Sequence, residues 1–185
     1  FHATKVFNTI EGGAIALRDK DRRNSLDFLK NFGIADKENV PYVGSNAKMN
    51  EFAAAMGLCN MKHLSEYIEK RKRICELYTE RLSDIKSIRL NKYNDDVTYN
   101  YAYFPIVVDK GDRDELYDSL AKENIFARKY FYPCTNAYEC YSESFDANET
   151  PIALDISKKV LTLPIYPDLE EAEVDRICSV IRREL

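Results

Sequence analysis

The 185-residue sequence has no tryptophan, six glycines, six prolines and only two histidines. Its five cysteines are widely spread and no two of them have Cys-x-x-Cys spacing, so only His2 and His63 could join them as ligands. A structural zinc site needs four closely spaced ligands of these types, so no metal site is expected. Unpaired thiols are typical of proteins in a reducing compartment, and we expect a cytoplasmic location.

The sequence also lacks a basic excess and long apolar runs. Its 27 Lys and Arg residues are outnumbered by 31 Asp and Glu residues, which gives a net charge of −4. Nucleic-acid-binding domains usually carry a basic face, so nucleic acid is not an expected partner. No apolar run approaches the roughly 20 residues of a membrane span, and no signal peptide is visible. The content of 45% hydrophobic and 31% charged residues predicts a globular protein.

Hydrophobic periodicity and turn residues predict an α/β chain in which helices and strands alternate after residue 84. We expect Pro105 to mark an edge or a bulge, Asp112 to cap a helix, and Ser45 or Asn46 to cap the longest helical stretch. The expected helices span residues 25–32, 48–59 and 64–82 (separate or continuous), 112–124, 151–157 and 169–185. The expected strands are a hairpin within 1–17 and the segments 88–90, 99–108, 125–132 and 160–163.

One lysine near the start stands among apolar neighbours. Phe1 and Ala3 precede Lys5, and Val6 and Phe7 follow it. Burial among such side chains would lower the lysine pKa and leave a neutral amine that can attack a carbonyl carbon. The alternative is an ordinary lysine that lays its stem on the core and keeps its ammonium in water. The neighbours alone favour this alternative.

Four ordered segments resemble one family of enzymes. Residues 1–15, Phe-His-Ala-Thr-Lys-Val-Phe-Asn-Thr-Ile-Glu-Gly-Gly-Ala-Ile, resemble the Schiff-base lysine segment of the pyridoxal-phosphate sugar aminotransferases, the DegT/DnrJ/EryC1/StrS family. Three later segments, 44–52, 127–133 and 160–167, resemble the same family in the same order. The resemblance covers nearly the whole chain.

The resemblance implies the C-terminal part of a fold-type-I aminotransferase. Residues 1–44 would be a remnant of the cofactor-binding large domain, 45–84 linking helices, and 85–185 a small C-terminal α/β domain. We expect the chain to be the C-terminal part of a longer protein, because the lysine segment lies past the middle of family members.

The resemblance also implies an activity. Lys5 would bond covalently to pyridoxal 5′-phosphate and move a proton as base and then as acid. The amino group would pass from glutamate to a nucleotide-linked keto-deoxy sugar such as a dTDP-4-keto-6-deoxyhexose. His2 belongs to a Phe-His-Ala-Thr-Lys segment similar to members that aminate C4. Lys5 argues against the related dehydratases, which have histidine at this position.

Further residues match family positions with alternatives open. Asn46 matches an asparagine that reaches the cofactor phosphate of the neighbouring subunit, which implies a homodimer; it could instead cap a helix. Lys48 replaces a common arginine, so it could attract the acceptor diphosphate or remain solvated. Arg128 and Tyr130 would border the acceptor pocket, although an aromatic strand is more often core. Thr135 stands where many members have histidine.

Two other hypotheses compete with an active enzyme. The first is a catalytically incomplete fragment that acts only as a folded or dimerising domain. In the family, upstream residues supply an acid for the pyridine nitrogen, an aromatic for the ring and a serine for the phosphate. The second is an α/β binding module without a cofactor, for which the four ordered resemblances would be accidental.

Overall fold

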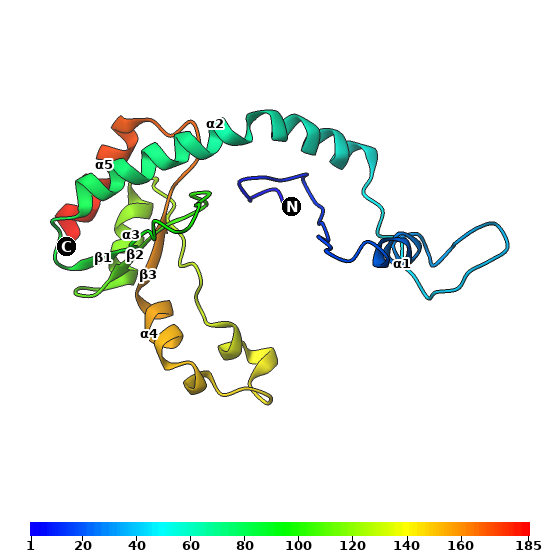
Figure 1. Cartoon of the computed structure of the whole chain (residues 1–185). Coiled ribbons are helices and arrows are strands. Elements are labelled where there is room, and N and C mark those ends of the chain that lie inside the picture. The colour runs from blue at the N-terminus through cyan, green and yellow to red at the C-terminus, as the bar shows by residue number, and fades with distance from the viewer. The chain divides into compact units, whose positions relative to one another are not determined.

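The computed structural model describes residues 1–185 and contains five α-helices and three β-strands (Figure 1). The chain divides into two compact units, which we call unit 1 (Phe1–Leu64) and unit 2 (Ser65–Leu185). The domain boundaries expected from the sequence stay a prediction. The elements are α1 (Arg22–Leu29), α2 (Glu51–Leu82), β1 (Ile88–Leu90), β2 (Phe104–Val108), α3 (Arg113–Lys122), α4 (Pro151–Lys159), β3 (Val160–Leu163) and α5 (Glu171–Glu184).

Unit 2 is built on an antiparallel sheet in the order β1-β2-β3. Ile88 pairs with Val108 across β1 and β2. Pro105 was expected at an edge or a bulge, and it lies in the middle strand β2. It has an edge only at its own position, because it faces Thr162 of β3 on one side while β1 already ends opposite Ile106 on the other. Pro105 therefore has a neighbouring strand on one side only, where its missing N–H is tolerated.

The core of unit 2 forms where helices cover this sheet. Asp112 caps α3 as expected, since its side chain accepts hydrogen bonds from the backbone N–H groups of Asp114 and Glu115. Tyr78 of α2 is fully buried, stacks on Phe104 at 4.9 Å between ring centroids, and donates its hydroxyl to the carbonyl of Pro164 at 2.9 Å. The helix expected over residues 169–185 is confirmed as α5, whose buried residues are Val174, Ile177, Cys178, Val180 and Ile181.

Helix α2 differs from the sequence prediction in its start and in its exposed face. It is one continuous helix of 32 residues that begins at Glu51 rather than at residue 48. The Asn50 side chain accepts the backbone N–H of Ala53 at 2.8 Å, so the predicted caps Ser45 and Asn46 are wrong. Phe52, an apolar residue within the expected helix 48–59, is 86% exposed.

Two predicted strand regions are wrong. Residues 1–17 form turns, bends and irregular backbone instead of a hairpin. The backbone N–H of Thr9 bonds to the carbonyl of Phe1 at 3.0 Å and closes a loop, so the chain folds back before a strand can form. Residues 125–132 form only a single bridge, between Arg128 and Thr162, and not a strand.

Unit 1 has little core of its own. Helix α1 covers residues 25–29 of the predicted segment 25–32. The chain turns after it at Gly33, which has φ +78° and donates its N–H to the Phe28 carbonyl at 2.7 Å. Ala53 is the one buried apolar side chain in this unit.

In unit 2, residues 134–150 contain three short 3-10 turns, and α4 confirms the short helix expected after them. None of the helices, α2 included, combines the length and the apolarity that a membrane crossing requires.

Candidate functional site

The loop that carries Lys5 is closed by backbone hydrogen bonds. The N–H of Lys5 bonds to the carbonyl of His2 at 3.0 Å, and Thr9 bonds back to Phe1. The rings of Phe1 and Phe7 meet edge to face at 5.0 Å. Lys5 is exposed, so its apolar neighbours pack on one another and do not bury it. The exposure of Lys5 agrees with the alternative that its neighbours alone favoured, a lysine not buried among them, while its catalytic role stays a prediction.

The base of this loop is fixed to the first half of α2, which Figure 1 shows running alongside the N-terminal segment. Asn60 donates its side-chain amide to the carbonyl of Asn8 at 2.9 Å. Thr9 is 3% exposed and packs so tightly that a Cβ at Gly57 would lie 2.8 Å from its methyl carbon. Lys5 thus sits on an exposed loop with an anchored base.

His2 belongs to the same loop. Its Nδ1 lies 2.6 Å from Oε1 of Glu11, and both side chains are exposed. The hydroxyl of Thr9 donates to the Glu11 carbonyl at 2.7 Å. The imidazole is therefore held beside a carboxylate that can orient its ring.

Asn46 and Lys48 lie in the segment before α2. Asn46 is exposed and forms an antiparallel bridge with Asn31, so it caps no helix and that alternative is excluded. The ammonium of Lys48 donates to Oδ1 of Asn31 at 2.9 Å and lies 4.3 Å from the centroid of the Phe32 ring. Lys48 is thus partnered within unit 1, neither purely solvated nor free for a diphosphate.

Arg128 and Tyr130 lie in unit 2. Arg128 is exposed, and its backbone exchanges two hydrogen bonds with that of Thr162, at 3.0 and 2.8 Å. Tyr130 is half-buried, with its ring 5.2 Å from that of Tyr103 and 3.5 Å from that of Phe131. Thr135 begins a short 3-10 turn nearby in the sequence.

Sequence reasoning missed two residues that interact with this region. Arg113 and Asp114 at the start of α3 contact the segment that holds Tyr130. A signal was present, because a cation in the first turn of a helix opposes the helix dipole and calls for a compensating partner. Separately, Arg71 of α2 is a half-buried cation. Its guanidinium donates to the Ile165 carbonyl at 3.1 Å, and burial lowers the pKa of this group.

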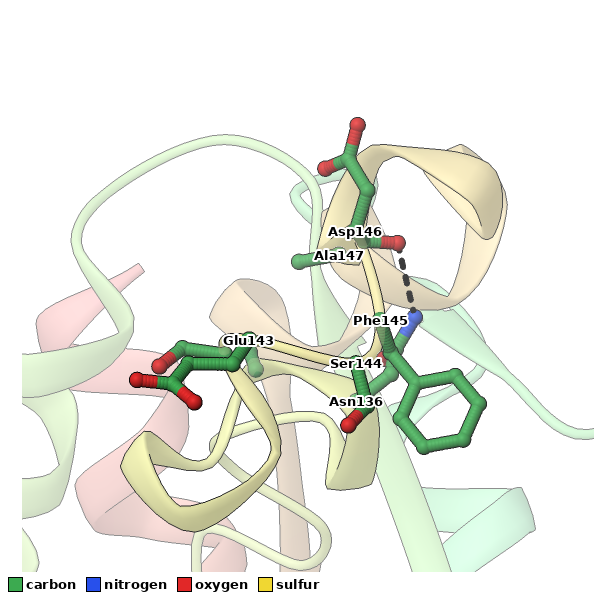
Figure 2. A pocket seen from close by; sticks show the side chains of 8 residues that line it. Asn136, Glu143, Ser144, Phe145, Asp146 and Ala147 are labelled. Carbon is green, nitrogen blue, oxygen red and sulfur yellow. Dashed lines mark hydrogen bonds between the residues drawn. The ribbon is translucent and has the colours of Figure 1, made fainter.

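A shallow hollow of about 550 Å³ lies elsewhere, in the loop before α4 (Figure 2). Figure 2 shows the amide of Asn136 donating to the backbone carbonyl of Asp146, at 3.3 Å. None of the residues predicted from the sequence lines this hollow. This hollow therefore does not coincide with the site residues predicted from the sequence.

Comparison with known proteins identifies the family. The model of the DegT/DnrJ/EryC1/StrS aminotransferase family matches residues 1–182. The chain belongs to this family. It is 39% identical over 185 residues to the dTDP-4-amino-4,6-dideoxy-D-glucose transaminase of Shigella dysenteriae and 43% identical over 176 residues to that of Escherichia coli. These alignments cover 98% and 92% of the chain but 50% and 47% of the two relatives, so the chain spans about half of their length.

Solved structures of aminotransferases agree with the fold. DesI, crystallised in the presence of its TDP-sugar product, matches 99% of the chain and 47% of its own length, with a TM-score of 0.88 and 29% identity. A putative sugar aminotransferase of Streptococcus pneumoniae, Spr1654, in its PLP form, matches all of the chain and 51% of its own length, with a TM-score of 0.86 and 20% identity. The DegT/DnrJ/EryC1/StrS family depends on pyridoxal phosphate, and this chain has a mixed α/β fold that aligns with about half of an aminotransferase.

Proposed function

We propose that these residues form the C-terminal half of an aminotransferase that moves an amino group from glutamate to a nucleotide-linked 4-keto-6-deoxy sugar. The match along the whole chain to two transaminases of a dTDP-4-amino-4,6-dideoxy sugar carries this proposal. Lys5 within its Phe-His-Ala-Thr-Lys segment is the residue on which the chemistry depends.

The donor chemistry of unit 1 fits the two ends of pyridoxal phosphate. The exposed primary amine of Lys5 suits its aldehyde, and the exposed amide of Asn46 suits phosphate oxygens, which accept hydrogen bonds strongly. Family resemblance assigns the ring contacts to residues that precede this segment in other members. The fit thus concerns the aldehyde and phosphate ends.

The residues of the chain then take distinct roles. Bound pyridoxal phosphate supplies an electron sink for the negative charge that develops on the substrate carbon. Lys5 Nζ would take the proton from that carbon as a base and then, as an acid, deliver it to the C4′ carbon of the cofactor. The loop that carries this amine is fixed at its base by the bond between Asn60 and Asn8. The Glu11 carboxylate orients the ring of His2 beside it.

Acceptor contacts would come from cations and aromatic rings. Arg128 offers a planar guanidinium that suits a diphosphate, and Tyr130 offers a ring and a hydroxyl for the sugar. Lys48 would first have to exchange Asn31 for the diphosphate. We therefore assign Lys48 the weaker contribution of the two cations.

Covalent trapping tests the proposal. The chain is incubated with pyridoxal phosphate, reduced with borohydride, digested and analysed by mass spectrometry. We expect a pyridoxyl adduct on Lys5 that is lost in Lys5→Ala and kept in Lys37→Ala, a control that removes another exposed lysine of unit 1. Labelling spread over surface lysines, without preference for Lys5, would overturn the assignment. Amino transfer from glutamate to a dTDP-4-keto-6-deoxyhexose then tests the substrate class.

The first half of α2 supports a second proposal, that the chain assembles as a homodimer. Four of its apolar side chains are exposed, namely Phe52, Met56, Leu58 and Met61, and contact with another protein surface would remove them from water. A second copy is the occupant that the role of Asn46 requires. The same contact would serve the alternative function, a folded domain that dimerises without catalysis.

Light scattering after size exclusion separates the two functions when it is combined with trapping. We expect a dimer for the wild-type chain, a monomer for Phe52→Asp, and no change for the exposed Glu76→Ala control. A dimer without a Lys5 adduct would favour the non-catalytic function. A monomeric wild-type chain would contradict the homodimer.

A further inference from the structure

Arg113, at the start of α3, is a buried cation with several partners. It is 6% exposed. Its Nε donates to Oδ1 of Asp114 at 2.6 Å, and one terminal nitrogen lies 3.2 Å from the Ser157 carbonyl and 3.3 Å from the Val160 carbonyl. These carbonyls lie at the C-terminal end of α4 and the start of β3, where a cation satisfies orphan acceptors and the helix dipole. A planar guanidinium reaches these acceptors from two nitrogens in a rigid fork, a geometry that the single compact ammonium of a lysine does not share.

Arg113 and Asp114 contact the segment around Tyr130, Asp114 before this residue and Arg113 after it. The guanidinium carbon of Arg113 lies 4.9 Å from the centroid of the Tyr132 ring. Asp114 lies 2.6 Å from the ammonium of Lys129, and this contact, together with that to Arg113, holds the pKa of the Asp114 carboxyl below its usual value. Lys129 also lies 4.6 Å from the centroid of the Tyr117 ring of α3. The residues before and after the pair Tyr130–Phe131 are thus both bound to the start of α3.

Backbone hydrogen bonds also hold the residues around Tyr130. Arg128 is fixed to Thr162 of β3 by two backbone hydrogen bonds, and the Thr162 hydroxyl lies 3.3 Å from the Arg128 carbonyl. Tyr132 donates its N–H to the Lys129 carbonyl at 2.8 Å, which closes a tight turn. The turn is therefore held at its first, second and last residues, and the half-buried Tyr130, whose ring lies 5.2 Å from that of Tyr103, is within it.

We propose that Arg113 and Asp114 are positioning residues that hold the turn 128–132 in the shape that presents Arg128 and Tyr130 to the acceptor nucleotide sugar. This inference rests on the proposed function. Neither residue touches the acceptor; each acts through its contact to the turn. Loss of either contact frees the turn without removing an acceptor-binding side chain.

Two readouts test the two halves of this inference separately. The first is hydrogen exchange of the 185-residue chain, followed by mass spectrometry of peptides that cover residues 126–134. We expect exchange there to rise several-fold in Asp114→Asn and in Arg113→Lys, with β2 and α5 unchanged. Arg183→Lys is the matched control, because Arg183 pairs with Glu123 and Glu184 at the surface of the same unit. Unchanged exchange in Asp114→Asn and Arg113→Lys would overturn the positioning role.

The second readout is steady-state kinetics of the holoenzyme with both substrates. We expect the KM for the nucleotide sugar to rise roughly tenfold in Asp114→Asn, because small misplacements of binding groups are costly, with the KM for glutamate and the glutamate half-reaction unchanged. A fall in both half-reactions alike would mark a merely structural role and overturn the link to the acceptor. If the wild-type holoenzyme transfers no amino group to the sugar, the proposed function fails and the link fails with it, while exchange still decides whether these residues hold the turn.

Discussion

Asn60 of α2 donates its side-chain amide to the backbone carbonyl of Asn8 at 2.9 Å, across 52 positions of sequence. This bond joins the helix to the loop that carries Lys5, three residues before Asn8. With the tight contact between Gly57 and Thr9, it fixes the base of the loop and leaves its tip exposed. Such an anchored support suits the role proposed for Lys5, in which its amine would bond to the cofactor and then be released.

Asn60→Ala should loosen the Lys5 loop. Removal of the amide leaves the Asn8 carbonyl without this donor and lets the loop open more often. We expect trypsin to cleave after Lys5 several-fold faster than in the wild-type chain, since local opening controls such cleavage. Cys59→Ala, at the exposed neighbouring position, is the control and should leave the rate unchanged. An equal rate in Asn60→Ala would show that the loop does not depend on this bond.

Gly33→Ala should disrupt the connection after α1. Gly33 has φ +78°, and an added Cβ would overlap the carbonyl oxygen of Tyr42. A non-glycine residue in this conformation costs about 1–3 kcal/mol before the overlap is counted. We expect the backbone N–H of Phe32, which bonds to the Ser45 carbonyl at 3.0 Å, to exchange at least tenfold faster.

The matched control for this change is Gly13→Ala. An added Cβ at Gly13 meets no atom within 4 Å. Protection of the Phe32 amide should therefore stay at the wild-type level in the control. Equal protection in both variants would mean that the Gly33 conformation adapts to a side chain.

Tyr78→Phe should destabilise unit 2 without changing its packing. The substitution keeps the ring stacked on Phe104 and removes the hydroxyl that donates to Pro164. A lost hydrogen bond at a buried site costs about 1–2 kcal/mol, which urea unfolding can measure. Tyr138→Phe, at an exposed position, should cost nothing measurable. A cost above about 3 kcal/mol would show that the ring itself had moved.

Alkaline pH should destabilise unit 2 through Cys178. Burial raises the pKa of this thiol from its usual value of 9.0 to about 12. Where the unfolded chain has lost the proton and the folded chain keeps it, unfolding is favoured. The contribution is therefore full below about pH 9 and is lost as pH rises from 9 to 12.

Urea midpoints at pH 7, 9 and 10.5 measure this effect. Cys178→Ala should show a smaller fall between pH 9 and 10.5 than the wild-type chain. The exposed Cys140→Ala keeps the full fall and serves as the control. Identical slopes in the wild type and Cys178→Ala would assign the alkaline loss to other groups.

Sequence reasoning predicted the elements of unit 2 well because their signals are local. The Asp112 cap lies within three residues of its partners, and the apolar spacing of α5 matches the face that it buries. In unit 1 the apolar pattern misled. Periodicity records that Phe52 is apolar, but it cannot tell whether the same chain covers that side chain.

Sequence motifs predicted the candidate site residues, but they did not predict the residues that hold those site residues in place. Lys5 and Asn46 came from a resemblance that the family match supports as a whole. The contacts of Arg113 span 44 and 47 positions, to Ser157 and Val160. Such pairings depend on how α3 packs near the end of α4, which no local pattern encodes.

The uneven distribution of buried apolar side chains predicts how the chain melts. The apolar core lies between Ile74 and Ile181, whereas Ala53 is the one apolar side chain that the first 64 residues bury. Heating should therefore give one cooperative transition that belongs to residues 65–185, while the earlier residues open at lower cost. A thermal-shift screen would then overlook a ligand bound at Lys5, and hydrogen exchange in residues 1–64 would reveal it.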